Sequence, residues 1–106
     1  MRHALPSGLW EGHYVQWGAR HPQKMTLEFA DGLMQGDGID GIGSFVIEGE
    51  YRVDEEEVRA GWIKTYVGRH SVLYLGTVRK GRLVGQWELG GFEGDFALHP
   101  VRSEPL

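Results

Sequence analysis

Short segments of alternating apolar and polar residues, separated by turns that contain glycine, recur along the whole chain. They predict strands, because successive side chains of a strand lie on opposite faces, and residues 8–18, the first segment, lack the i, i+3, i+4 apolar spacing of a helix. The 106 residues include 17 glycines, and glycine accepts the positive φ that tight hairpin turns need. We therefore predict an all-β fold. Eight strands are expected, at residues 8–18, 23–30, 33–37, 43–52, 57–67, 70–79, 82–89 and 92–99.

Turn signals stand between these segments. They lie at Asp31-Gly32, residues 36–41, Gly68-Arg69, Lys80-Gly81 and Gly90-Gly91. Such short connections make sequential strands antiparallel neighbours, and eight strands in that order hide their unpaired edges by closing into a barrel. The predicted architecture is an eight-stranded antiparallel up-and-down (meander) β-barrel. One domain is expected over residues 1–106, with irregular termini at 1–7 and 101–106.

The period of two assigns an unusual set of polar and aromatic residues to the inside of this barrel. The candidate ligand-binding residues are Tyr14, Gln16, Tyr51, Trp62, Lys64, Tyr66, His70, Tyr74 and Trp87. Burying Lys or His without a partner is unfavourable, so such groups mark a water-filled cavity, a paired charge or a ligand. We expect a pocket for a small anionic or carbonyl-bearing molecule. The alternative is that these residues lie near strand ends, with Lys64 reaching water and the tyrosine hydroxyls bonded to loop backbone.

Several short runs, in this order along the chain, resemble segments of one known family. They are Gly8-Leu9-Trp10, Gly49-Glu50-Tyr51, Trp62-Ile63-Lys64, His70-Ser71 followed by Gly76, and Gln86-Trp87. Together they resemble the avidin and streptavidin group within the calycin superfamily of eight-stranded meander barrels. The resemblance implies a barrel with a small-molecule mouth, and it carries over Tyr51, Trp62 and Trp87 as ligand contacts.

The chain departs from the avidin pattern where biotin is held. In avidins an Asn and a Ser in the first strand and the following loop contact the ureido oxygen of biotin, whereas this sequence contains no Asn and has Gly12 at that position. Tyr74 stands where a sixth-strand Trp is expected, and Gly94 where a last-strand Asp is expected. The expected ligand is therefore a molecule other than biotin.

Two other classes of function remain open. One is a small enzyme in which His70 or Lys64 acts as general acid or base and tyrosines stabilise an enolate or oxyanion. The other is a structural or protein-interaction scaffold that forms a dimer or tetramer, because Val15, Trp17, Leu73 and Leu75 have outward parity. We favour a non-catalytic ligand barrel over both.

Composition argues against most other classes. The net charge of −4 disfavours nucleic-acid and anionic-membrane binding, and the absence of cysteine removes thiolate metal sites. None of the five histidines stands in a paired metal-binding spacing, and residues 37–41 do not match a calcium loop, so neither metal nor cofactor is expected. The N-terminal residues lack the apolar region of a secretory signal, and no apolar run approaches a membrane span, which predicts a cytoplasmic protein.

Overall fold

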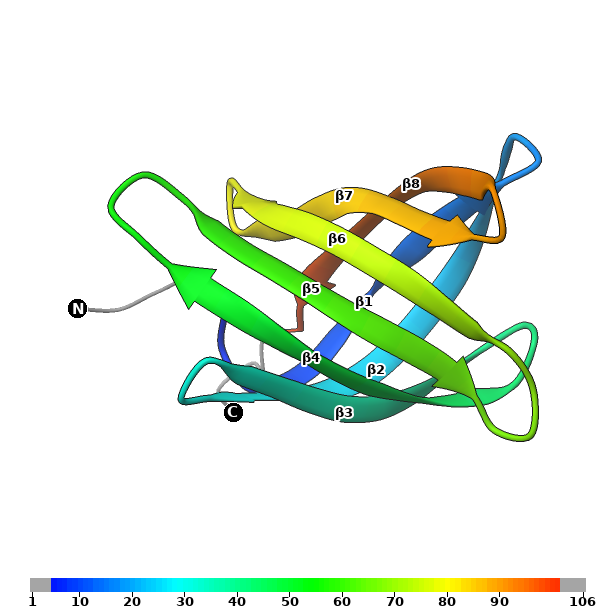
Figure 1. Ribbon diagram of the computed structural model, residues 1–106, viewed down its shortest axis with the longest axis horizontal. Helices are drawn as coiled ribbons and strands as arrows, with labels where there is room; N and C mark the ends of the chain where they lie inside the picture. The colour runs from blue at the N-terminus through cyan, green and yellow to red at the C-terminus, as the bar shows by residue number, and fades with distance from the viewer. Residues whose placement is uncertain (1–4, 102–106) are drawn as a thin grey trace, which may run out of the picture.

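The computed structural model describes residues 5–101, which form a closed barrel of eight antiparallel strands (Figure 1). Each strand pairs with the next in sequence, and β8 pairs with β1 to close the ring. This confirms the predicted all-β, up-and-down barrel. The strands are β1 Gly8–Gln16, β2 Ala19–Ala30, β3 Leu33–Asp40, β4 Ser44–Val53, β5 Val58–Tyr66, β6 Ser71–Arg79, β7 Arg82–Leu89 and β8 Phe92–Pro100.

Two strand boundaries differ from the sequence-based prediction in ways that matter for the site. β3 runs on through residues 38–40, so most of the glycine-rich stretch expected to be a turn is strand and carries Asp40 into the barrel wall. The first strand stops at Gln16, and Trp17-Gly18 form a two-residue hairpin turn, whereas the prediction has both residues in the first strand. Trp17 is not a residue that such turns favour, which is why this one was missed.

The predicted alternation of faces is present in most strands. In β5, for example, Ala60, Trp62, Lys64 and Tyr66 are buried, and the intervening Ile63 is exposed. In β8, however, Phe92, which was expected to face inward, is exposed, and Phe96, Ala97 and Leu98 are buried in succession. Aromatic rings fill the centre: Trp62 stacks on Tyr74 with ring centroids 5.3 Å apart, and Phe96 packs edge-on against both. The barrel interior is a packed core.

Glycines on the inner face allow strands to lie close together at points where the wall bends. At Gly85 in β7, a Cβ atom would overlap the carbonyl oxygen of Leu75 in β6. The residue that pairs with Gly85 in β6 is Gly76, so neither strand has a side chain there. These glycines therefore serve close backbone packing.

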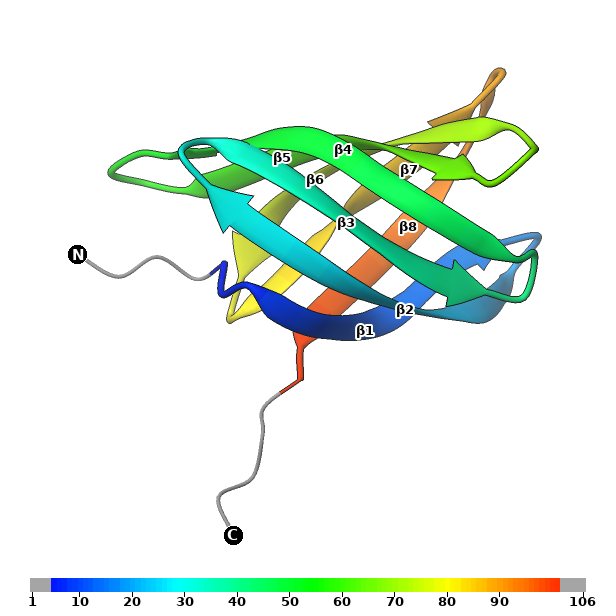
Figure 2. The same cartoon turned by 90° about the horizontal axis from the view of Figure 1, so that it is seen from below.

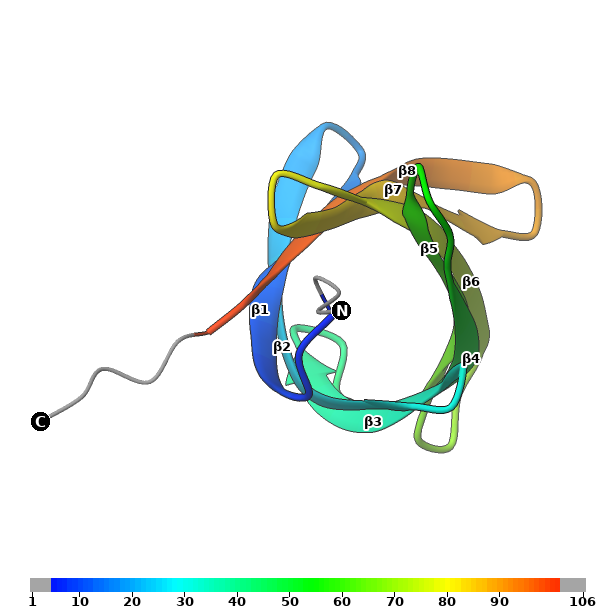
Figure 3. The ribbon, with the colours of Figure 1, turned by 90° about the vertical axis from the view of Figure 1, so that its left-hand side faces the viewer.

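The two ends of the barrel differ. At the end where β1 begins, the chain turns across the opening, and Leu5 is buried (Figures 2 and 3). Trp10 Nε1 donates a hydrogen bond to the Pro6 carbonyl oxygen, and Ser7 Oγ accepts one from the Phe29 amide. We call the opposite end, formed by the β1–β2, β3–β4, β5–β6 and β7–β8 connections, the mouth. No helix within residues 5–101 is long and apolar enough to cross a membrane.

Candidate functional site

A fully buried ion pair lies inside the barrel, between Lys64 of β5 and Asp40 at the end of β3. The Lys64 Nζ and Asp40 Oδ2 atoms are 2.6 Å apart, and neither side chain is exposed to solvent. Nζ also donates to Gln23 Oε1 at 2.8 Å and to the Tyr74 hydroxyl at 3.4 Å, so all three ammonium hydrogens have acceptors. Asp40 accepts two further hydrogen bonds, from the Tyr66 hydroxyl at 2.6 Å and from the Ile42 amide at 2.8 Å.

Aromatic rings surround the Lys64 ammonium. The ring centroid of Phe45 lies 4.3 Å from Nζ, and those of Tyr14, Tyr66 and Tyr74 lie 4.9, 5.0 and 5.4 Å away. Ring faces attract a cation, and this attraction strengthens when the cation is removed from water. The rings and the carboxylate together offset part of the loss of hydration of Lys64.

The buried charges shift the pKa values of the cluster. Burial lowers the pKa of Lys64 to about 8, against the opposing effect of Asp40. Burial disfavours the Asp40 carboxylate, but hydrogen bonds from Lys64 and Tyr66 outweigh it and hold the pKa of Asp40 below its usual value. Burial, with the charge of Asp40 added, raises the pKa of Tyr14, Tyr66 and Tyr74. At neutral pH these three phenols therefore keep their protons.

Gln23 of β2 completes the cluster. Its side-chain oxygen accepts from Lys64, which leaves its amide nitrogen buried without a hydrogen-bond partner. A buried polar group without a partner is unfavourable, and native proteins contain few of them. The cluster is thus built for charge pairing, with one donor left over.

A small cavity opens at the mouth, next to this cluster. Its volume is about 30 Å³, which is room for one or two water molecules. Tyr66 and Tyr74 line it and at the same time bond to Asp40 and Lys64, so they separate the ion pair from the cavity. The cavity is lined by Tyr14, Gln16, Ile42, Tyr66, His70, Val72, Tyr74, Trp87 and Leu89.

The structure divides the nine predicted site residues into three groups. Six of them line the mouth cavity: Tyr14, Gln16, Tyr66, His70, Tyr74 and Trp87. Trp62 and Lys64 lie in the core, so Lys64 does not extend to water as the alternative interpretation supposed. Tyr51 packs edge-on against Phe29, which contacts Trp10 at the closed end of the barrel.

Two members of the cluster, Gln23 and Asp40, were absent from the predicted site. Gln23 shares its inward parity with Met25, Leu27 and Phe29, which was a usable signal. Asp40 shares parity with Met34, Gly36 and Gly38, but reading that stretch as a turn hid the alternation.

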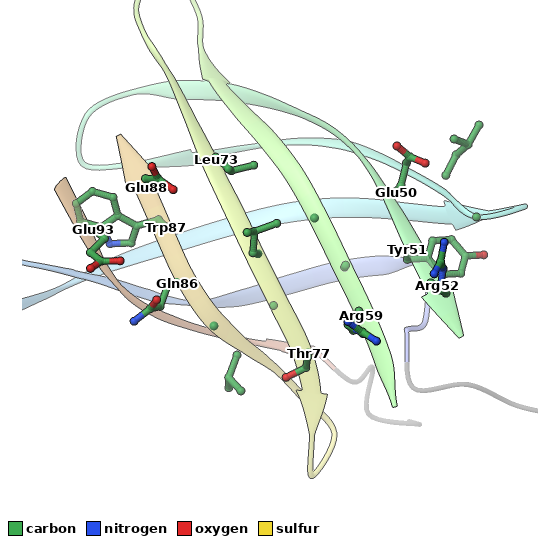
Figure 4. Close-up of a pocket in the computed structure, with 18 of the residues that line it drawn as sticks. Glu50, Tyr51, Arg52, Arg59, Leu73, Thr77, Gln86, Trp87, Glu88 and Glu93 are labelled. Carbon is green, nitrogen blue, oxygen red and sulfur yellow. The ribbon is translucent and has the colours of Figure 1, made fainter. Parts of the chain in front are cut away.

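A larger groove of about 930 Å³ lies on the outside of the barrel, across β4 to β7 (Figure 4). Leu73, Leu75 and Val84 contribute apolar side chains to it, and Leu75 is 56% exposed. Figure 4 shows Arg52 and Arg59 towards one end and Glu88 and Glu93 at the other. Trp17, which we had grouped with Leu73 and Leu75, does not line this groove.

Fold and site together define a closed β-barrel with a polar, aromatic mouth above a buried ion pair. Within residues 5–101, no group of three or more His, Asp or Glu side chains is arranged to hold a metal ion. Comparison of the chain with family models, with curated proteins and with solved structures finds no match.

Proposed function

We propose that this protein binds a small organic molecule whose oxygen-bearing polar group enters the mouth cavity. The observation that most supports this proposal is the cavity itself, which opens to solvent and is lined by polar groups held in place by the buried charge cluster. The Tyr74 hydroxyl accepts a hydrogen bond from Lys64, so its own proton is left for another acceptor. A carbonyl or carboxylate oxygen is the matching group.

The size of the cavity limits what can enter it. Sites that enclose a whole organic ligand usually exceed about 300 Å³. A cavity of about 30 Å³ admits only a head group, while the remainder of the ligand stays outside the barrel. This argues against an enclosed ligand of the size of biotin.

The geometry gives less support to an enzyme. Lys64 is fully buried beneath Tyr66 and Tyr74 and does not line the cavity. His70 lines it, and its ring packs against Tyr66 at 5.0 Å, but within residues 5–101 no hydrogen bond orients its imidazole. A general base is normally oriented by a third group.

The ligand proposal is tested by screening a metabolite library, biotin included, for compounds that raise the thermal melting temperature. For any hit, Tyr74→Phe should weaken binding about 3- to 10-fold, because one hydrogen bond to the head group is lost. Tyr51→Phe, outside the mouth cavity, is the matched control and should leave the affinity unchanged; weaker binding by Tyr51→Phe alone would place the ligand in the outer groove, which Tyr51 lines, and would reject the mouth. Equal affinities of the two variants for every hit would reject the mouth as the site.

A second candidate function, self-association through the outer groove, is favoured by its distribution of charge. Arg52 and Arg59 are paired residues on neighbouring strands, and so are Glu88 and Glu93 at the other end. A two-fold axis through the groove would bring the arginines of one copy to the glutamates of the other, with Leu75 buried between them. Glu50 lies beside the arginines, and Arg59 already forms an ion pair with Glu57 at 3.1 Å. Arg52 is therefore the arginine more available to a glutamate of a second copy.

A further inference from the structure

The β1–β2 turn contains an aromatic residue in an unfavourable backbone conformation. Trp17 has a φ of 54° and its side chain is 81% exposed. Positive φ is a genuine outlier for a bulky side chain, and the first position of such a turn favours Asn, Asp or Gly. The equivalent turn between β2 and β3 follows that preference, with Asp31 at a φ of 52°. Lys80 in the β6–β7 turn has the same φ of 54°, so what distinguishes Trp17 is the combination of this conformation with a large, exposed apolar ring.

Trp17 contacts one other exposed aromatic side chain, that of Phe92 at the start of β8. Their ring centroids are 5.9 Å apart in an edge-on arrangement, and Phe92 is 60% exposed. Two large apolar rings thus lie together in water, from two connections of the same barrel end. Exposed apolar surface of this kind is typical of a binding site.

Each residue of this pair is a neighbour of a residue that lines the mouth cavity. Trp17 directly follows Gln16, and Phe92 pairs with Leu89 across the β7–β8 hairpin, and both Gln16 and Leu89 line the cavity. Trp87 Nε1 of β7 donates a hydrogen bond of 2.9 Å to the Val15 carbonyl oxygen near the end of β1, which connects these two parts of the mouth. The aromatic pair is therefore the apolar border of the mouth.

We propose that Trp17 and Phe92 hold the apolar body of the ligand whose oxygen-bearing head enters the mouth. The inference rests on the proposed function and adds the ligand class: an amphiphilic small molecule with a flat apolar body attached directly to a carbonyl or carboxylate. The cavity is too small for more than the head, so the body must lie against the border, and a flat ring system stacks on tryptophan. The unfavourable positive φ of Trp17 is then explained by the contribution of its ring to binding.

The test uses a series of probes with the same head and bodies of different size: acetate, benzoate and 2-naphthoate, with 2-naphthamide as the uncharged counterpart. Dissociation constants are measured by NMR titration, following the indole N–H signals. We expect 2-naphthoate to bind at least 10-fold more tightly than acetate. Comparison of 2-naphthoate with 2-naphthamide distinguishes a carboxylate ligand from a neutral carbonyl ligand.

Three variants separate the contribution of the aromatic pair from that of the head-group site. Trp17→Asn removes the ring and should weaken 2-naphthoate binding at least 5-fold while leaving acetate unaffected. Lys80→Asn is the matched control, because Lys80 has the same φ of 54° in the β6–β7 turn at the other end of the barrel, and it should change neither. Tyr74→Phe should weaken both probes, because it acts on the head group.

The effects of the variants on probe affinity differ according to which of the two proposals is wrong. If Tyr74→Phe weakens both probes and Trp17→Asn weakens neither, the mouth is the site and the aromatic border is not part of it. If Trp17→Asn alone acts on 2-naphthoate, the pair binds apolar rings independently and both proposals are wrong as stated. Loss of a dimer in Trp17→Asn, measured by light scattering, would assign the pair to a second copy of the chain instead. Absence of binding by 2-naphthoate and 2-naphthamide would reject the ligand class.

Discussion

At the scale of single residues, Lys64 and Asp40 are the most consequential pair in the barrel. A buried ion pair gains little net stability, because the desolvation of both charges offsets their attraction, but removing one partner leaves the other charge uncompensated. Here the Asp40 carboxylate would lose the ammonium 2.6 Å away and keep only the Tyr66 and Ile42 hydrogen bonds. The pair therefore makes the interior sensitive to substitution at either position.

Lys64→Met should lower the free energy of unfolding by about 3–5 kcal/mol, the usual loss when one partner of a buried pair is removed. Adding Asp40→Asn should recover part of that loss, because Asn is uncharged, its carbonyl oxygen can still accept from the Ile42 amide, and its NH2 group can donate to the Tyr66 hydroxyl oxygen. Urea unfolding of both variants measures this. A loss below about 1 kcal/mol in Lys64→Met would contradict the buried pair.

At the scale of strands and turns, glycine has two separate roles in this chain. In the turns it supplies positive φ, as at Gly32 and Gly81, where the two-residue hairpins are recognisable from sequence. In the strands it allows close approach, as at Gly85 against Leu75 of the neighbouring strand. The second role is recognisable only once the strands are paired.

Gly85→Ala should destabilise the barrel by at least about 2 kcal/mol, because the added methyl group meets backbone that cannot move without separating β6 from β7. Gly41→Ala is the matched control: no atom lies within 4 Å of a Cβ at Gly41. Its φ is also outside the positive range, so the control should change stability by less than about 0.5 kcal/mol. Thermal unfolding compares the two, and equal losses would show that packing at Gly85 is not limiting.

At the scale of the whole molecule, closure of the sheet determines which surfaces are available for binding. All eight strands have neighbours on both sides, so within residues 5–101 no strand edge is left for pairing with another chain. One barrel end is covered by residues 5–7, which leaves the mouth and the outer groove as the candidate binding surfaces of the described part of the chain.

If the outer groove is a self-association surface, Leu75→Lys should convert a dimer to a monomer, because it places a charge in the apolar centre of the interface. Ile39→Lys is the matched control, since Ile39 is 57% exposed on β3 and does not line the groove. Sedimentation equilibrium of the wild type and both variants measures the mass. A monomeric wild type at high concentration would reject the second candidate function.

Sequence alone was sufficient for the fold and for the inside or outside position of most side chains. Turn glycines and the alternation of Trp62, Lys64 and Tyr66 predict strands, hairpins and a closed barrel, because these are local properties of the chain. It was also sufficient to select Lys64 as a residue in need of a partner. It was insufficient to name Asp40 as that partner.

Only the tertiary structure decided which inward residues meet. Alternation assigns a side chain to a face, but not to a height along the barrel axis, because height depends on the tilt and stagger of strands that close with each other. That is why Tyr51 and Tyr74 share inward parity and lie in different parts of the barrel, while Lys64 reaches Asp40 of β3 and Gln23 of β2 across the interior. The contact of Trp17 with Phe92 has the same origin, because closure brings the β1–β2 and β7–β8 turns together.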